Sequence, residues 1–180
     1  DVISMGSTDL TYTILPAMRD AMHAEKMGMP VFQVMGNHDN CYMTAKHPVA
    51  GNTNRELNLN IQRMFEETFG PINYSFNRGD VHIVGMRDIV YTVNTSAAKY
   101  QGGFLRSQYE WLKQDLSFVP KDKLVIFCVH IPLTNSSAQN VQKVIALLKQ
   151  YKEAHIMSGH THYMRNEPTL SGGVYEHVHA

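Results

Sequence analysis

The chain has 180 residues, of which 43% are apolar, enough for one domain with a sizeable core and too few for two ordinary domains. Its 16 basic residues balance its 16 acidic residues, so no overall charge attracts it to nucleic acid or to an anionic membrane surface. No apolar run approaches the roughly 20 residues that span a bilayer, and the two cysteines, Cys41 and Cys128, have neither zinc-ribbon spacing nor the density of a disulfide scaffold.

Short apolar runs alternate with longer amphipathic stretches along the chain, which is typical of an α/β layer fold. The segment YSFNRGDVHIVGM predicts an antiparallel hairpin, and residues 40–55 predict a long polar loop. In chain order, the patterns predict strand 2–5, helix 13–27, strand 31–35, helix 56–68, strands 73–77 and 81–86, helix 105–117, strand 123–129, helix 138–150, and strands 154–158 and 174–179.

The first segment with metal-ligating side chains is VFQVMGNHDN, where a predicted buried strand ends at Met35. Gly36 allows a sharp turn that presents Asn37, His38 and Asp39 together. An amide oxygen, an imidazole and a carboxylate then share one loop. The alternative is an Asx turn, in which the polar side chains only bond their own backbone.

Two further segments place histidines after predicted strands. In LVIFCVHIPL, six apolar residues lead to His130, and Pro132 prevents the strand from continuing. In HIMSGHTHY, His160 and His162 follow a strand with one residue between them, and in an extended segment this spacing puts both rings on the same side. The alternatives are a hydrogen-bonded core histidine for His130 and two solvated loop histidines for the pair.

Taken together, the three segments deliver nitrogen and oxygen donors at three strand-to-loop junctions of one expected sheet. Strand ends are the usual positions of ligands in α/β sheets. Imidazole combined with amide or carboxylate oxygen suits zinc, manganese or iron better than calcium. The sequence therefore predicts a transition-metal site.

The same motifs resemble those of the calcineurin-like metallophosphoesterases. GNHD at 36–39, His130 after an apolar strand and GHTH at 159–162 occur in the order and context of that family. GPINYSFNRGDVHIVGM is similar to the family's hairpin, and GFLRSQYEWLKQDL to the helix before the His130 strand. The chain most resembles the bacterial branch that carries an additional C-terminal domain.

The resemblance implies a β-sandwich of mixed sheets flanked by helices (αββα). It also implies hydrolysis of phosphate mono- or diesters by two divalent metal ions (manganese, iron or zinc) and a metal-activated hydroxide. Asn37, His130 and His160 match ligands of the second metal, and His162 matches a ligand of the first. His38 matches the residue that binds the phosphoryl group and protonates the leaving alkoxide. Asp39 would orient its loop without binding metal.

Two departures from the family pattern bear on activity. The family's opening aspartate and histidine, which complete the first metal's ligands, have no counterpart, and Ser7 follows Gly6 where the family has a metal-bridging aspartate. Three explanations stay open: a real substitution, a bridging role for Asp9, or residues missing between Gly6 and Ser7. A real substitution would favour the alternative function, a non-catalytic metal-binding or scaffold member of the same fold.

Both ends of the sequence suggest a piece of a longer polypeptide, since a strand begins almost at the first residue and VYEHVHA stops inside one. We therefore expect residues 1–180 to be a single catalytic domain that lacks its first strand and its C-terminal part. Oligomeric state and compartment are not indicated.

Several other polar residues are assigned no role as metal ligands. His82 is expected at the surface or at a sheet edge. His177 and His179 are expected in structural or pocket-lining positions. Arg165 and Asn166, just beyond GHTH, are expected either to reach substrate or to be solvated.

Overall fold

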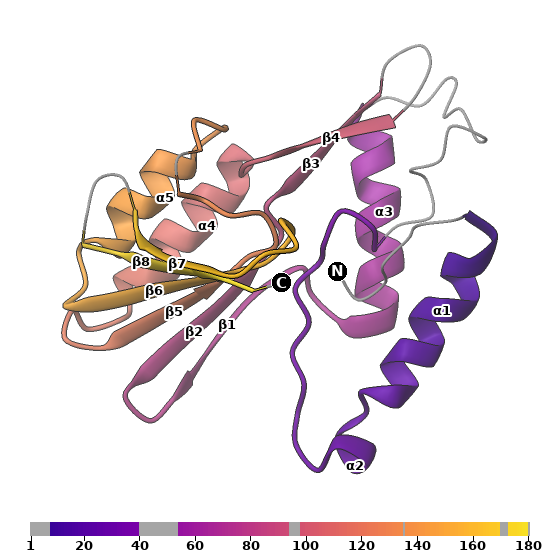
Figure 1. Ribbon diagram of the computed structural model, residues 1–180, viewed down its shortest axis with the longest axis horizontal. Helices are drawn as coiled ribbons and strands as arrows, with labels where there is room; N and C mark the ends of the chain where they lie inside the picture. Colours follow the sequence, from indigo (N-terminus) through magenta and orange to yellow (C-terminus); the bar gives the residue numbers. More distant parts are fainter. Residues whose placement is uncertain (1–7, 40–53, 94–97, 135, 170–172, 180) are drawn as a thin grey trace. The chain divides into compact units, whose positions relative to one another are not determined.

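The computed structural model describes residues 8–39, 54–93, 98–134, 136–169 and 173–179 (Figure 1). The chain divides into two compact units, one of Asp1–Ile72 with Val90–Gln101 and one of Asn73–Ile89 with Gly102–Ala180. Each unit is described by itself. The predicted strand 2–5 and the Gly6–Ser7 junction lie outside the described residues, and the single domain over residues 1–180 stays a prediction.

The first unit is mainly helical, with α1 (Thr8–Ala21), α2 (Ala24–Met27) and α3 (Asn54–Phe69). Helix 56–68 is confirmed by α3, whereas the predicted helix 13–27 is in fact two helices. The break has a local cause, because His23 leaves helical geometry and its Nδ1 accepts the N–H of Glu25 as an N-cap. Gly28, with a φ of 70°, ends α2.

The predicted strand 31–35 is wrong, because these residues have no regular secondary structure. The apolar run indicates burial only in part, since Met35 is fully buried whereas 56% of the surface of Phe32 is exposed. A strand, however, also needs a neighbour that supplies backbone partners. Neither sheet of the described residues includes residues 31–35.

The second unit contains a six-stranded mixed sheet in the order β1-β2-β5-β6-β8-β7. Strands β2, β5, β6 and β8 are parallel, and β1 and β7 pair antiparallel at the two edges. The predicted hairpin is confirmed by β1 and β2, with Tyr74 opposite Gly85. The strands span Asn73–Arg78 (β1), Val81–Met86 (β2), Leu124–Cys128 (β5), Glu153–Ser158 (β6), Arg165–Pro168 (β7) and Tyr175–Val178 (β8).

Three strands lack a counterpart among the predictions. Strands β3 (Ile89–Val93) and β4 (Ala98–Gly102) form a separate two-stranded sheet. Strand β7, with the sequence RNEP, has no apolar alternation to mark it, and its proline is compatible with a strand only because β7 lies at the sheet edge.

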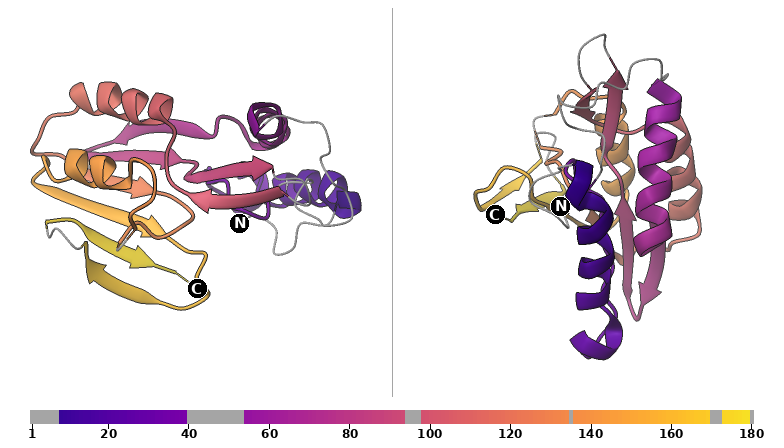
Figure 2. Two further views of the ribbon diagram at one scale, coloured as in Figure 1. Left: turned by 90° about the horizontal axis from the view of Figure 1, so that it is seen from above. Right: turned by 90° about the vertical axis from the view of Figure 1, so that its right-hand side faces the viewer.

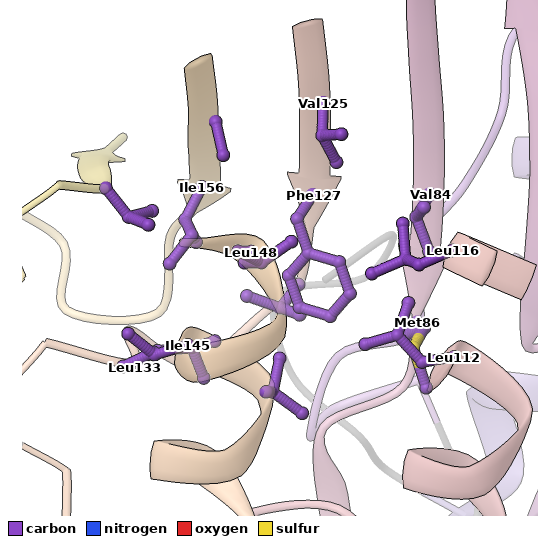
Figure 3. Packing of buried hydrophobic residues seen from close by; sticks show 14 of the residues in the cluster. Val84, Met86, Leu112, Leu116, Val125, Phe127, Leu133, Ile145, Leu148 and Ile156 are labelled. Carbon is purple, nitrogen blue, oxygen red and sulfur yellow. The ribbon is translucent and has the colours of Figure 1, made fainter. Parts of the chain in front are cut away.

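Helices α4 (Arg106–Ser117) and α5 (Val141–Leu148) lie side by side on one face of the sheet (Figures 1 and 2). The core forms between them and strands β2, β5 and β6, with Phe127 of β5 fully buried at its centre (Figure 3). A six-stranded mixed sheet flanked by helices confirms the predicted α/β fold class. No helix of the described ranges is long and apolar enough to cross a membrane.

The prediction for His82 is wrong, since only 3% of its surface is exposed. Its ring lies between β2 and α4, with Nε2 2.9 Å from Oδ2 of Asp115 and Nδ1 2.8 Å from Oδ1 of Asn77. Oδ1 of Asp115 also accepts the hydroxyl of Ser75 at 2.6 Å. One carboxylate therefore ties α4 to the first two strands.

Asp115→Asn is expected to lower the free energy of unfolding by about 1–3 kcal/mol, because an amide leaves one of these two donors without an acceptor. Urea unfolding followed by circular dichroism measures the change. The matched control is Asp122→Asn at an exposed turn, which should change stability by less than about 0.5 kcal/mol. Equal stability of the two variants would contradict a structural role for Asp115.

Candidate metal centre

The carboxyl ends of the four parallel strands meet at one edge of the sheet, and two of the predicted ligands lie there. His130 follows β5 after one further residue, and His160 follows β6. Nε2 of His130 is 3.1 Å from Nδ1 of His160, and the rings meet edge to face with centroids 4.9 Å apart. Only 6% of His130 is exposed. The structure thus brings together two imidazoles that are 30 residues apart in sequence.

The backbone of the two loops accounts for this proximity. β5 and β6 are neighbours, and their pairing continues past the strands, where Val129 donates its N–H to Met157 and Gly159 donates to the carbonyl of His130. Each histidine therefore leaves the sheet at the same level.

The loop GHTH is not extended, which corrects the geometry assumed for it. His160 and His162 both have left-handed backbones, with φ of 67° and 59°. This conformation is costly for residues with a Cβ, and it is concentrated at functional sites. In the bend His160 faces His130, whereas His162 is exposed.

The separation of the two ring nitrogens can be compared with what a shared metal requires. Imidazole nitrogens bind zinc at about 2.0–2.1 Å, so two of them at right angles on one ion lie about 3 Å apart. The observed 3.1 Å fits this arrangement, and it is also the length of a hydrogen bond between the two rings. Within the described ranges, no three His, Cys, Asp or Glu side chains are grouped so as to hold a metal. The fit therefore concerns His130 and His160 as two ligands of one ion.

Two buried carboxylates that bond the segment after β5 were not predicted from the sequence. Asp88, two residues beyond β2, and Glu176, in β8, are both fully buried. Burial raises the pKa of Asp88 to about 7, against the lowering effect of the backbone N–H groups of His130 and Ile131, and the charge of Glu176 adds to the rise. The sequence signal is a carboxylate in a segment that is otherwise largely apolar, GMRDIV or GVYEHV, because a buried charge needs bonded partners.

The GNHD motif lies in the first unit and forms a turn. Oδ2 of Asp39 accepts the N–H of Gly36 at 2.8 Å, and the N–H of Asp39 lies 3.3 Å from the carbonyl of Gly36. Asn37 and Asp39 are buried, and His38 is half-buried between them. The bond from Asp39 closes the turn that carries Asn37 and His38. The ligand role of Asn37 and the catalytic role of His38 stay predictions.

Residues beyond GHTH bond to one another on β6, β7 and β8. Arg165 pairs with Glu167 at 3.0 Å, and Asn166 Oδ1 is 2.8 Å from Nδ1 of His177. Nε2 of His177 in turn lies 2.8 Å from Nδ1 of His155. These contacts give Asn166 and His177 partners within the sheet itself.

Ligands of α/β sheets usually bind at the carboxyl ends of the strands, where His130 and His160 lie. A family model described as calcineurin-like phosphoesterase matches residues 6–164, which include all three motifs. The chain belongs to the calcineurin-like phosphoesterases. The predicted family is confirmed, and membership supports a metal-dependent hydrolase of phosphate esters at the level of the family. No curated protein matches the chain.

Proposed function

We propose that the protein hydrolyses phosphate mono- or diesters with two divalent metal ions, and that His130 and His160 bind the same ion. The single observation that carries this proposal is the 3.1 Å separation of their ring nitrogens at the carboxyl edge of the sheet. Family membership supports a phosphate-ester substrate and divalent metals. In the proposal Asn37 is a further ligand of the ion held by the two histidines, and His162 is a ligand of the other.

When bound, the divalent ions lower the pKa of water and offset the charge of the phosphoryl group. The protein's own residues do the remaining work. His130 and His160 are held by the loops after β5 and β6 and keep one ion at the strand ends. His38 hydrogen-bonds the phosphoryl group and donates a proton to the leaving oxygen. Asp39 holds the turn that presents His38, through its bond to Gly36.

The expected result is metal-dependent hydrolysis of p-nitrophenyl phosphate or of bis(p-nitrophenyl) phosphate. Protein stripped with a chelator should be inactive, and Mn²⁺, Fe²⁺ or Zn²⁺ should restore the rate. Release of p-nitrophenolate measures both esters, and the two rates together distinguish a monoesterase from a diesterase. Absence of hydrolysis of either ester with any of the three metals would contradict the proposal.

The alternative function is a non-catalytic member of the fold that binds metal without hydrolysis. The residue that favours it is Ser7, which stands where the family has the bridging aspartate. Metal analysis of the purified protein separates the two. Two ions per chain support the enzyme, whereas one ion or none, together with absent hydrolysis, supports the alternative.

A further inference from the structure

We infer that Asp88 and Glu176 are positioning residues of the metal centre, whose carboxylates hold the backbone of residues 130–134 and thereby keep His130 within ligand distance of His160. The inference rests on the proposed function, in which these two histidines bind one ion. It adds two residues outside the three motifs, and it assigns them a role through the backbone.

The first carboxylate holds the beginning of the segment. Oδ1 of Asp88 accepts the N–H of His130 at 3.1 Å, and Oδ2 accepts the N–H of Ile131 at 2.9 Å. Both oxygens are thus used on consecutive residues. Asp88 is itself fixed, because its side chain is fully buried and its carbonyl accepts the N–H of Gly103 at 2.8 Å.

The second carboxylate holds the end of the segment. Oε1 of Glu176 accepts the N–H of Leu133 at 2.8 Å, and Oε2 accepts the N–H of Thr134 at 2.6 Å. Oε1 also accepts the hydroxyl of Ser158, the last residue of β6, at 2.8 Å. Glu176 therefore joins the segment after β5 to the strand that leads to His160.

Every backbone N–H of residues 130–134 is thus bonded to one of the two carboxylates, because the remaining residue, Pro132, has no N–H. After β5 the segment leaves the sheet while it is still largely buried, so its N–H groups need acceptors. Carboxylates form stronger bonds than neutral acceptors. Their use at every available donor indicates that the path of this segment is strongly specified.

A backbone hydrogen bond links this segment to the loop that carries His160. The carbonyl of His130 accepts the N–H of Gly159, the residue before His160, at 3.0 Å. Leu133, within the clamped segment, is buried in the hydrophobic core. A shift of residues 130–134 would therefore move His130 relative to His160 and open the 3.1 Å gap between their ring nitrogens.

The test compares Asp88→Asn and Glu176→Gln with Asp115→Asn. In all three variants the replaced carboxylate accepts at least two hydrogen bonds through its two oxygens, so the amide leaves one donor facing an NH₂ group. Only Asp88 and Glu176 bond the segment that carries His130. Titration calorimetry with Zn²⁺ measures metal affinity. The visible spectrum of the Co²⁺-loaded protein reports ligand geometry, and urea unfolding measures stability.

We expect Asp88→Asn and Glu176→Gln to bind Zn²⁺ about 10- to 100-fold more weakly, with an altered Co²⁺ spectrum. Asp115→Asn should lose stability but keep the wild-type affinity and spectrum. Wild-type affinity and spectrum in both test variants, combined with a loss of stability like that of Asp115→Asn, would overturn the inference, because the carboxylates would then be structural only.

A milder variant covers the case in which neither test variant folds. Ser158→Ala removes one of the three donors of Glu176 and keeps both carboxylates. A weaker Zn²⁺ affinity in this variant supports the inference, and an unchanged affinity with an unchanged Co²⁺ spectrum overturns it. If the wild type binds metal but hydrolyses no phosphate ester, the proposed function fails while these affinity measurements still decide the positioning role.

Discussion

His160→Ala is expected to lower kcat/KM for p-nitrophenyl phosphate by more than about 100-fold and to weaken metal binding at least as much. Loss of an outer partner of a ligand already costs about 10- to 100-fold, and loss of the ligand itself should cost more. The ring of His160 faces His130 at 3.1 Å, so its removal leaves the ion with one imidazole at this edge. Initial rates and Zn²⁺ calorimetry measure the two effects.

The double substitution tests whether the two histidines act on one ion. If they do, His130→Ala should be about as inactive as His160→Ala, and the double variant should be little worse than either. Effects of residues that act as a unit are strongly non-additive. Multiplicative losses in the double variant would indicate that the two rings serve separate ions.

His155→Ala is the matched control for these variants. His155 lies on the same strand that leads to His160, is partly buried, and contacts His177 and Glu153 instead of His130. Its replacement should leave kcat/KM and the Zn²⁺ affinity at the wild-type values. Equal losses in His155→Ala and His160→Ala would mean that the activity follows the stability of β6 and would contradict a ligand role for His160.

The parts of the fold that the sequence predicts are those in which an apolar pattern and a pairing partner coincide. β5 is an apolar run with Val125 and Phe127 buried in the core, and it also pairs with β2 on one side and β6 on the other. The run at 31–35 is also mainly apolar and is not a strand, because composition does not report the neighbour that a strand needs. β7 shows the reverse case. Its four residues, RNEP, have no apolar pattern, and they form a strand because they pair with β8.

The candidate site is predictable to the extent that parallel strands share an edge. His130 and His160 each follow one of two neighbouring parallel strands, so their proximity follows from the order of the sheet. The left-handed backbone of His160 is not indicated by any local pattern in the sequence. The roles of Asp88 and Glu176 depend on hydrogen bonds to residues 42 or 43 positions away in the sequence, and no local motif indicates such bonds.

His38→Ala is expected to distinguish two roles of one imidazole. If His38 both binds the phosphoryl group and protonates the leaving oxygen, the variant should lose most of the rate with p-nitrophenyl phosphate. With phenyl phosphate it should lose about 10- to 100-fold more, because general-acid assistance contributes about 10²–10⁴-fold to departure of a basic leaving group. The more weakly basic p-nitrophenolate needs less of this assistance.

The comparison of the two esters has an internal control in Asp39→Ala. Asp39 holds the turn through the N–H of Gly36, and an alanine removes the oxygen that accepts that bond. A displaced turn should lower the rate with both esters by the same factor, because it misplaces His38 without changing the chemistry of the leaving group. If His38→Ala also lowers both rates by one common factor, His38 acts only on the phosphoryl group. A larger loss with phenyl phosphate in His38→Ala alone assigns the proton to His38.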